Sequence, residues 1–328
     1  MSDQTHPSPP IVDPYQYLQI IPNPDGTITR NFNSFPKIPS APDFTHTAPV
    51  LTKDIPISPS NNTWFRLYLP TTALTSFSSD NKLPLIVYFH GGGFVLCSAE
   101  HSIFDDFCAN LATDLHLIVA SVEYRLAPEH RLPAAYDDAM ESLHCIKTIE
   151  DDWLKRYADF SKCFIMGISA GGNIAYQVGL RAADAVDDVS PIKIRGLILQ
   201  QPFFGGVERT GSELRLMNDP RLPPIVCDLM WDLSLPVGVD RDHEYSNPRA
   251  STGLENVKKL GWRVLVTGCD GDPLIDRQIE LVKIMKERGV EAVGHFSVGD
   301  YHGVEVMEPS KAKKSHAVIK DFLSSASI

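Results

Sequence analysis

Short apolar runs alternate with longer helix-like segments through most of this chain of 328 residues. The apolar runs are 83–89, 117–122, 163–167, 194–200 and 262–267. A later strand is predicted near 293–298, and 64–69 alternates like a half-exposed strand. The helix-like segments are 103–115, 134–148, 171–183, 273–288 and 311–323. Apolar runs of this length suit strands that are buried on both faces. Their alternation with helices predicts an α/β fold with a mostly parallel central sheet flanked by helices.

Two regions break this alternation. Residues 1 to about 50 are polar and contain many prolines, which predicts an extended or loosely helical leader with a short helix at 15–21. Residues 203–250 carry many Pro, Arg and Asp residues and one apolar helical run at 225–235, without an obvious core strand. We therefore expect one catalytic domain over 1–328, with a helical cap formed by about 1–45 and about 203–250.

Charge and composition exclude several classes of partner. The formal net charge is −11 at pH 7, whereas nucleic acids and anionic membranes need clustered Lys and Arg. No apolar stretch is long enough to cross a bilayer, and the first ten residues lack the basic start and apolar run of a secretory signal, so we expect a cytoplasmic protein. The six cysteines are scattered singly, which predicts reduced thiols in or near the core.

The sharpest motif is Gly-Ile-Ser-Ala-Gly at 167–171, between an apolar run and a helix-like segment. A tight turn from strand to helix needs small neighbours around a serine and exposes its hydroxyl. The N-terminus of the following helix also directs positive charge toward that hydroxyl. A five-residue pattern of this kind also occurs by chance, but this context favours Ser169 as a nucleophile.

A second motif, His-Gly-Gly-Gly-Phe, covers 90–94 directly after the apolar run 83–89. Three glycines allow the backbone amides of Gly91 and Gly92 to approach a substrate oxygen, and the amide of Ala170 completes a candidate oxyanion hole. The alternatives are a glycine-rich turn or a phosphate loop, but no Gly-Lys-Ser/Thr follows.

A nucleophilic serine needs a base, and the base needs a carboxylate to orient it. His302 follows the predicted strand near 293–298, and we prefer it to His295, which lies within that strand. Three acids follow the run 262–267, and we rank them Asp272, then Asp276, then Asp270. The expected order of nucleophile, acid and histidine along the chain is then satisfied.

These motifs together resemble the plant carboxylesterases of the hormone-sensitive lipase family, from about residue 14 to the C-terminus. The resemblance rests on HGGGF at 90–94, YRLAPEH at 124–130, GISAGGN at 167–173, DPLID at 272–276 and YHG at 301–303. It implies an α/β-hydrolase fold, a Ser169–His302–Asp272 triad and hydrolysis of short acyl esters of small molecules, including acetylated specialised metabolites. Two alternatives remain: a lyase or cyclase on this scaffold, and a small-molecule binder like the gibberellin receptors, which have replaced the triad histidine.

One residue departs from the family pattern, because Ile168 stands where an acid usually precedes the serine. This change leaves the nucleophile intact but alters the surroundings of the turn, so it favours a narrow substrate range. Ile168 is a candidate pocket residue, and four aromatic residues either join it there or pack in the core: Phe94, Phe203, Phe204 and Trp231. The mechanism needs no metal or organic cofactor, and 242–244 lacks the spacing of a metal site.

Overall fold

The computed structural model describes residues 12–43, 48–75 and 82–326. Its strands are β1 (Ile20–Pro22), β2 (Ile28–Arg30), β3 (Val50–Ser58), β4 (Thr63–Pro70), β5 (Leu83–Phe89), β6 (Ile118–Glu123), β7 (Ala158–Ile168), β8 (Ile194–Gln200), β9 (Arg263–Gly271) and β10 (Glu291–Tyr301). Its α-helices are α1 (Pro14–Leu18), α2 (Thr72–Thr75), α3 (Ser102–Leu115), α4 (Ala134–Thr148), α5 (Asp152–Tyr157), α6 (Ala170–Asp184), α7 (Gly211–Arg215), α8 (Pro224–Ser234), α9 (Leu254–Lys259), α10 (Ile275–Glu287), α11 (Val304–Met307) and α12 (Pro309–Ala326), with 3₁₀ helices η1 (Val186–Val189) and η2 (Pro248–Ala250).

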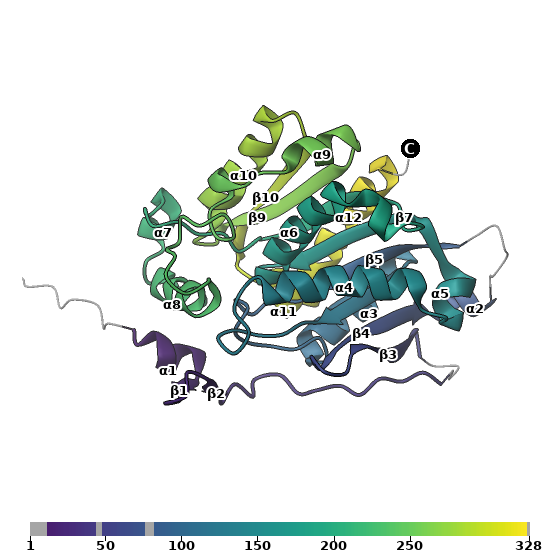
Figure 1. Cartoon of the computed structure of the whole chain (residues 1–328), viewed down its shortest axis with the longest axis horizontal. Coiled ribbons are helices and arrows are strands. Elements are labelled where there is room, and N and C mark those ends of the chain that lie inside the picture. Colours follow the sequence, from purple (N-terminus) through teal and green to yellow (C-terminus); the bar gives the residue numbers. More distant parts are fainter. Residues whose placement is uncertain (1–11, 44–47, 76–81, 327–328) are drawn as a thin grey trace, which may run out of the picture.

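The central sheet has the order β10-β9-β8-β7-β5-β6-β4-β3 (Figure 1). All neighbouring strands from β10 to β6 pair in parallel, whereas β4 pairs antiparallel with both β6 and β3. The predicted mostly parallel α/β fold is therefore confirmed. Sequence analysis missed β3, an edge strand whose Lys53, Asp54 and Pro56 hide its strand character.

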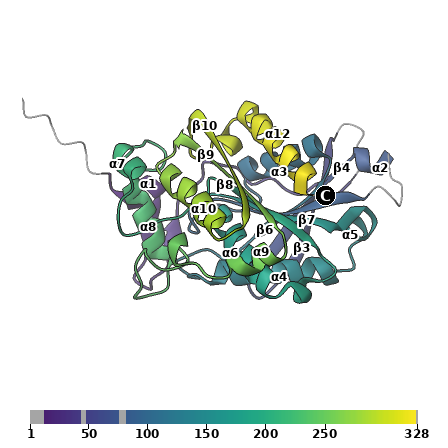
Figure 2. The same cartoon turned by 90° about the horizontal axis from the view of Figure 1, so that it is seen from above.

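Helices cover both faces of this sheet. Figure 2 shows α3 and α12 on one face and α4, α6 and α9 on the other. Alternate residues of β5 enter two separate apolar clusters: Leu85 and Val87 pack on the α6 side, and Ile86 and Tyr88 pack on the α3 side. This two-residue alternation explains why a central strand such as β5 is apolar along its whole length.

The α1–β2 part of the leader lies beside residues 203–250 at one end of the molecule, where Figure 1 shows α1 close to α8. The Tyr17 hydroxyl donates a hydrogen bond of 2.8 Å to the carbonyl of Pro220. The helix predicted at 15–21 ends early, at Leu18, because Gln19 adopts a left-handed conformation (φ 54°) and the chain continues into β1. Residues 1–11 and 44–45 of the predicted cap lie outside the described residues.

Two further expectations concern single features of the chain. Each of the six cysteines is free, and four of them are buried: Cys108, Cys163, Cys227 and Cys269. Of the helices in the described part of the chain, none combines the length and apolar character of a membrane span.

Candidate active site

Ser169 occupies a strained turn between β7 and α6. Its backbone has φ 55° and ψ −120°, a region that residues other than glycine rarely adopt, and its amide is held by the carbonyl of Gln200 at 2.9 Å. The flanking glycines are required by space: a Cβ on Gly167 would lie 2.1 Å from the carbonyl oxygen of Gly171, and a Cβ on Gly171 would lie 1.9 Å from that of Phe89. The turn thus places the Ser169 side chain beyond the end of β7, at the start of α6.

His302 and Asp272 reach Ser169 from the loops after β10 and β9. The Ser169 Oγ lies 2.9 Å from His302 Nε2, and His302 Nδ1 lies 2.8 Å from Asp272 Oδ2. Hydrogen bonding to a carboxylate places the proton of a neutral imidazole on Nδ1, so Nε2 is free to accept the Ser169 proton. The structure therefore brings the three predicted side chains into one hydrogen-bonded series.

Asp272 is completely buried and has three donors. Its Oδ1 accepts from the amide of Leu274 at 2.9 Å, and its Oδ2 accepts from Gln278 Nε2 at 2.8 Å as well as from His302. A buried carboxylate with several donors is held in one orientation. Burial lowers the pKa of His302, but the negative charge and hydrogen bond of Asp272 outweigh this effect, so the pKa of His302 is raised above its ordinary value.

The weaker candidates from the sequence lie elsewhere. Asp276 accepts a hydrogen bond from the amide of Ser212, at the start of α7, and Asp270 accepts one from the amide of Gly299. His295 is exposed on β10. Each of the two carboxylates thus holds a turn, and neither contacts His302.

Gln201 was missed by sequence analysis, although it fixes the loop that carries His302. Its buried side chain donates from Nε2 to the carbonyl of Tyr301 at 3.1 Å and accepts at Oε1 from the amide of Gly303 at 2.5 Å. These are the two neighbours of His302 in the chain. The available signal was its position, because a polar residue directly after the buried strand β8 lies at the edge where the other strands end.

The candidate oxyanion amides lie beside Ser169. A Cβ on Gly91 would be 3.3 Å from the Cβ of Ser169, and Gly92 has φ +117°. Among the groups that the structure describes, none accepts a hydrogen bond from the amides of Gly91, Gly92 or Ala170. Tyr124 supports this loop: its ring stacks on His90 at 4.3 Å, and its hydroxyl donates to the carbonyl of His90 at 2.8 Å. Three amides without protein acceptors are therefore held next to the serine hydroxyl.

A cavity of about 360 Å³ opens onto Ser169 and His302. Most of its lining is apolar, and Arg221 supplies the one full positive charge among the lining residues that the structure describes. The lining comes from the leader (Tyr17, Leu18, Phe32, Phe35), the glycine loop and α3 (Gly91, Gly92, Leu96, Cys97, Ile103, Phe104), the serine turn (Ile168, Ser169), the region before and within α8 (Arg221, Leu222, Val226, Met230) and the His302 segment (His302, Gly303, Val306, Met307).

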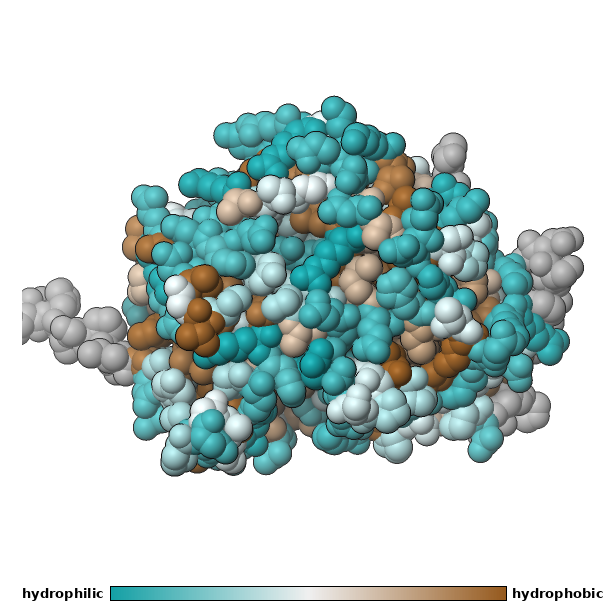
Figure 3. All heavy atoms as spheres, viewed as in Figure 1, coloured by the Kyte–Doolittle hydropathy of each residue, from teal (hydrophilic) through white to brown (hydrophobic). Residues whose placement is uncertain are grey.

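Of the five predicted pocket residues, Ile168 lines this cavity and the four aromatic residues do not. Phe94, Phe203 and Trp231 pack on one another, with the rings of Phe203 and Trp231 stacked at 4.7 Å, and Phe204 packs on Tyr176. All four side chains are at most 1% exposed and pack in the core, so the structure does not place them in the wall of this cavity. Figure 3 shows exposed apolar side chains at the end of the molecule where α1, α7 and α8 lie.

A strand-to-helix turn that exposes a serine, with a histidine and a buried acid on later strand ends, defines the class of α/β hydrolases. The family described as having the alpha/beta hydrolase fold matches residues 86–306, which is more than half of the chain. The chain therefore belongs to the α/β-hydrolase family.

Similar proteins identify its branch of that family. The chain is 55% identical to carboxylesterase 20 of Arabidopsis thaliana over 96% of this chain and 97% of that protein. It is 46% identical to a 3-O-acetylpapaveroxine carboxylesterase of Papaver somniferum, over 95% of this chain and all of that protein. An esterase structure from Pyrobaculum calidifontis is 28% identical, covers 84% of both chains and has a TM-score of 0.71. The chain is thus an enzyme, a serine carboxylic-ester hydrolase of the plant type related to hormone-sensitive lipase.

Proposed function

We propose that Ser169 is the nucleophile of this esterase, His302 its general base and Asp272 the group that orients the imidazole. His302 Nε2 accepts the Ser169 proton while Oγ attacks the ester carbonyl carbon, and the carbonyl electron pair moves onto its oxygen. The amides of Gly91, Gly92 and Ala170 stabilise this oxyanion. The observation that supports the proposal is the pair of hydrogen bonds, 2.9 Å and 2.8 Å long, that joins the three side chains.

The second half of the reaction uses the same groups. As the tetrahedral intermediate collapses, the carbon–oxygen bond to the alcohol breaks and protonated His302 gives its proton to the leaving oxygen. An acyl group then remains on Ser169 Oγ. Water attacks this ester, His302 accepts the water proton, and the carboxylic acid leaves as Ser169 regains its proton.

We further propose that the chain is one hydrolase domain whose cap is formed by the leader and residues 203–250. Both regions contribute lining to the cavity over Ser169: Phe32 and Phe35 come from the leader, and Val226 and Met230 come from α8. Contact between Tyr17 and Pro220 joins the two parts. A cap of this kind excludes water from the oxyanion and selects the substrate.

The substrate that fits best is an uncharged small-molecule ester with a short acyl group. A cavity of about 360 Å³ with a mainly apolar lining accommodates a compact apolar alcohol, whereas burying a charged group there would be costly. The poppy relative is named for an acetylated compound, and this agrees with a short acyl group. An acetylated specialised metabolite is therefore our preferred substrate class.

The test compares hydrolysis of p-nitrophenyl acetate and butyrate by the wild type, Ser169→Ala and Ser60→Ala. Ser60 is an exposed turn residue, so its variant controls for the loss of a hydroxyl. We expect Ser169→Ala to lose about 10⁴-fold or more of kcat and Ser60→Ala to retain wild-type activity. Undiminished turnover by Ser169→Ala would exclude the proposed nucleophile. Covalent labelling of the wild type by an organophosphate without turnover of any ester would favour a lyase or cyclase.

A further inference from the structure

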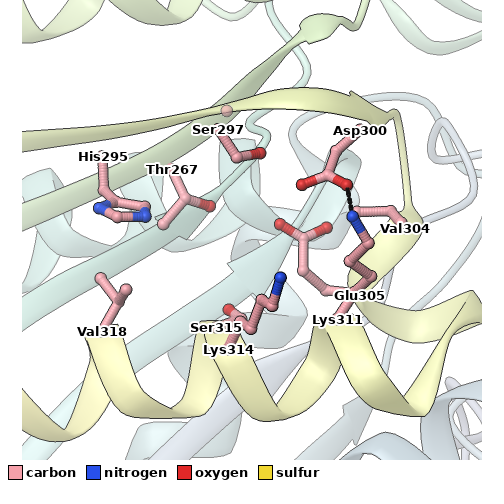
Figure 4. A pocket seen from close by; sticks show the side chains of 11 residues that line it. Thr267, His295, Ser297, Asp300, Val304, Glu305, Lys311, Lys314, Ser315 and Val318 are labelled. Atoms are coloured by element: carbon pink, nitrogen blue, oxygen red, sulfur yellow. Dashed lines mark hydrogen bonds and ion pairs between the residues drawn. The ribbon is translucent and has the colours of Figure 1, made fainter.

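A second cavity, of about 100 Å³, lies between β10 and α12, near the segment that carries His302 (Figure 4). Its lining is polar where that of the substrate cavity is apolar. It includes Thr267 from β9, Ser297 and Asp300 from β10, Glu305 from α11, and Lys311 and Lys314 from α12. No step of the proposed ester hydrolysis uses any of these side chains.

Glu305 is the unusual member of this set. It lies three residues after His302, in α11, and only 9% of it is exposed. Its carboxylate enters the cavity between the side chains of β10 and those of α12 (Figure 4). Among the described residues, none donates a hydrogen bond to its Oε2, and the Oγ1 of Thr267 is also buried without a partner. A buried carboxylate without full hydrogen bonding costs stability, so its presence calls for a compensating role.

The two acids near Glu305 have partners of their own. Asp300 forms an ion pair with Lys311, and Asp272 is occupied by its own donors. Glu305 has no ion pair within the part of the chain that the structure describes. The titratable and charged groups around it are Cys269 and Asp272 near the end of β9, His295 and Asp300 on β10, Lys311 and Lys314 on α12, and Tyr88 on β5.

The other element that packs on α11 is α3. It presents Ile103 and Phe104 near the site, while its Asp105 accepts hydrogen bonds from Arg66 and Tyr68 instead. Lys314 lines the same cavity, but the group whose positive charge favours the charged form of Glu305 is the imidazole of His302.

We propose that Glu305 is a positioning residue that stabilises the protonated imidazole of His302 from the polar cavity. This inference rests on the proposed function, in which His302 becomes positively charged as it accepts the Ser169 proton. Asp272 holds the imidazole through a hydrogen bond, and Glu305 adds a second negative charge without a direct contact. In the low-dielectric surroundings of the site, such a charge acts over several ångströms.

The electrostatics of the two groups agree with this arrangement. Burial raises the pKa of Glu305 to about 7, against an opposing effect of His302, which favours its charged form. Glu305 in turn raises the pKa of His302, after the larger effects of burial and Asp272. The pKa values of both groups are thus raised above their ordinary values, and ionisation of either one is coupled to the other.

The experiment compares the pH dependence of kcat/KM for p-nitrophenyl butyrate in the wild type, Glu305→Gln and Glu291→Gln. Glu291 carries the same charge at the start of β10, exposed and paired with Arg263, so its variant is the matched control. Loss of the Glu305 charge lowers the pKa of His302, so the acidic limb of the Glu305→Gln profile should move to lower pH. Its plateau kcat should fall about 3- to 10-fold, because the imidazolium is less stabilised.

Thermal unfolding separates this role from a structural one. The folded-state pKa of Glu305 exceeds its ordinary value of 4.5, so this residue lowers the free energy of unfolding as the pH rises from about 4.5 to about 7. Glu305→Gln should therefore be at least as stable as the wild type at pH 8. Glu305→Asp, which restores the charge, should return the acidic limb toward its wild-type position.

An unmoved acidic limb in Glu305→Gln, or an equal shift in Glu291→Gln, would overturn the proposal. These outcomes leave the proposed function intact, because that function is tested separately by Ser169→Ala. Failure of Ser169→Ala to lose activity would instead remove the proposed function and this inference together.

Discussion

The loops at the ends of β7, β9 and β10 differ from the leader, which is part of the proposed cap over them, in the interactions that fix their positions. In these loops, backbone conformation and buried hydrogen bonds set the positions: Ser169 has φ 55°, and Asp272 has three donors in a fully buried site. Alternative arrangements there would leave buried polar groups unpaired.

The leader, which is one part of the proposed cap, is held partly by exposed side chains. Arg30 of the leader donates from Nε to the carbonyl of Val95 and from Nη2 to that of Ala127, each at 2.7 Å, and pairs with Glu129 at 2.6 Å. Both partners of this ion pair are about one quarter exposed. We therefore expect the leader to move at smaller cost than the loops beneath it. The difference predicts that changes in the loops affect kcat, whereas changes in the leader affect KM and substrate choice.

The largest effect is expected for Asp272→Asn. An amide at this position no longer stabilises the imidazolium and can favour the wrong tautomer of His302, so kcat should fall about 10⁴-fold. Steady-state kinetics with p-nitrophenyl butyrate measure this loss. Asp270→Asn is the matched control, because the Asp270 side chain is exposed and accepts a hydrogen bond from the amide of Gly299, and it should retain most of the activity. Similar losses in both variants would contradict the assignment of the acid.

A smaller loss is expected for Gln201→Ala, which removes both hydrogen bonds beside His302. A misplacement of the imidazole by about 1 Å costs on the order of 100-fold, so kcat should fall by about that factor while KM changes little. Circular dichroism and thermal unfolding check that the variant is folded. A folded variant with wild-type kcat would show that the loop is held without Gln201.

Loosening the leader should affect KM more than kcat. Arg30→Met breaks the contacts to Val95, Ala127 and Glu129, and the leader also carries Phe32 and Phe35 of the cavity lining. We expect KM to rise about tenfold, with a smaller change in kcat. The double variant with Glu129→Gln should add little, because each change breaks the same ion pair. A loss confined to kcat would contradict the proposed difference between the catalytic loops and the leader.

The smallest effect is expected at Ile168, where the loop meets the cavity. Ile168→Val removes one methylene from an apolar wall, a change of about 0.8 kcal/mol or about fourfold. The ratio of kcat/KM for butyrate over acetate should change by that factor, while the acetate rate stays close to the wild type. An unchanged ratio would mean that the acyl chain does not contact Ile168.

Much of the loop region was predictable from sequence, because backbone constraints leave residue patterns. Gly167 and Gly171 must be glycines because a Cβ at either position would collide with backbone atoms. His302 directly follows a predicted strand, which the structure shows as β10. Asp272 was preferred over Asp270 and Asp276 on the same grounds, and the structure places it next to His302.

The contacts of the leader and the lining of the pocket were less predictable, because they depend on contacts between distant parts of the chain. The four aromatic residues predicted for the pocket pack in the core instead: Phe94, Phe203 and Trp231 contact one another, and Phe204 contacts Tyr176. Two partners of Arg30, Ala127 and Glu129, lie far along the chain in the YRLAPEH segment. In that segment Glu129 also accepts from the amide of Ile28, and Arg125 pairs with Asp138. No local sequence pattern predicts such a pairing.

The central claim is that an acyl group passes through Ser169, and trapping that intermediate tests it most directly. The wild type is mixed with p-nitrophenyl butyrate, quenched in acid at early times, digested and analysed by peptide mass spectrometry. We predict one butyryl group on the peptide that carries Ser169, formed together with a burst of p-nitrophenol and absent from Ser169→Ala. Butyryl groups on another residue during turnover, or turnover by Ser169→Ala at the wild-type rate, would contradict the account.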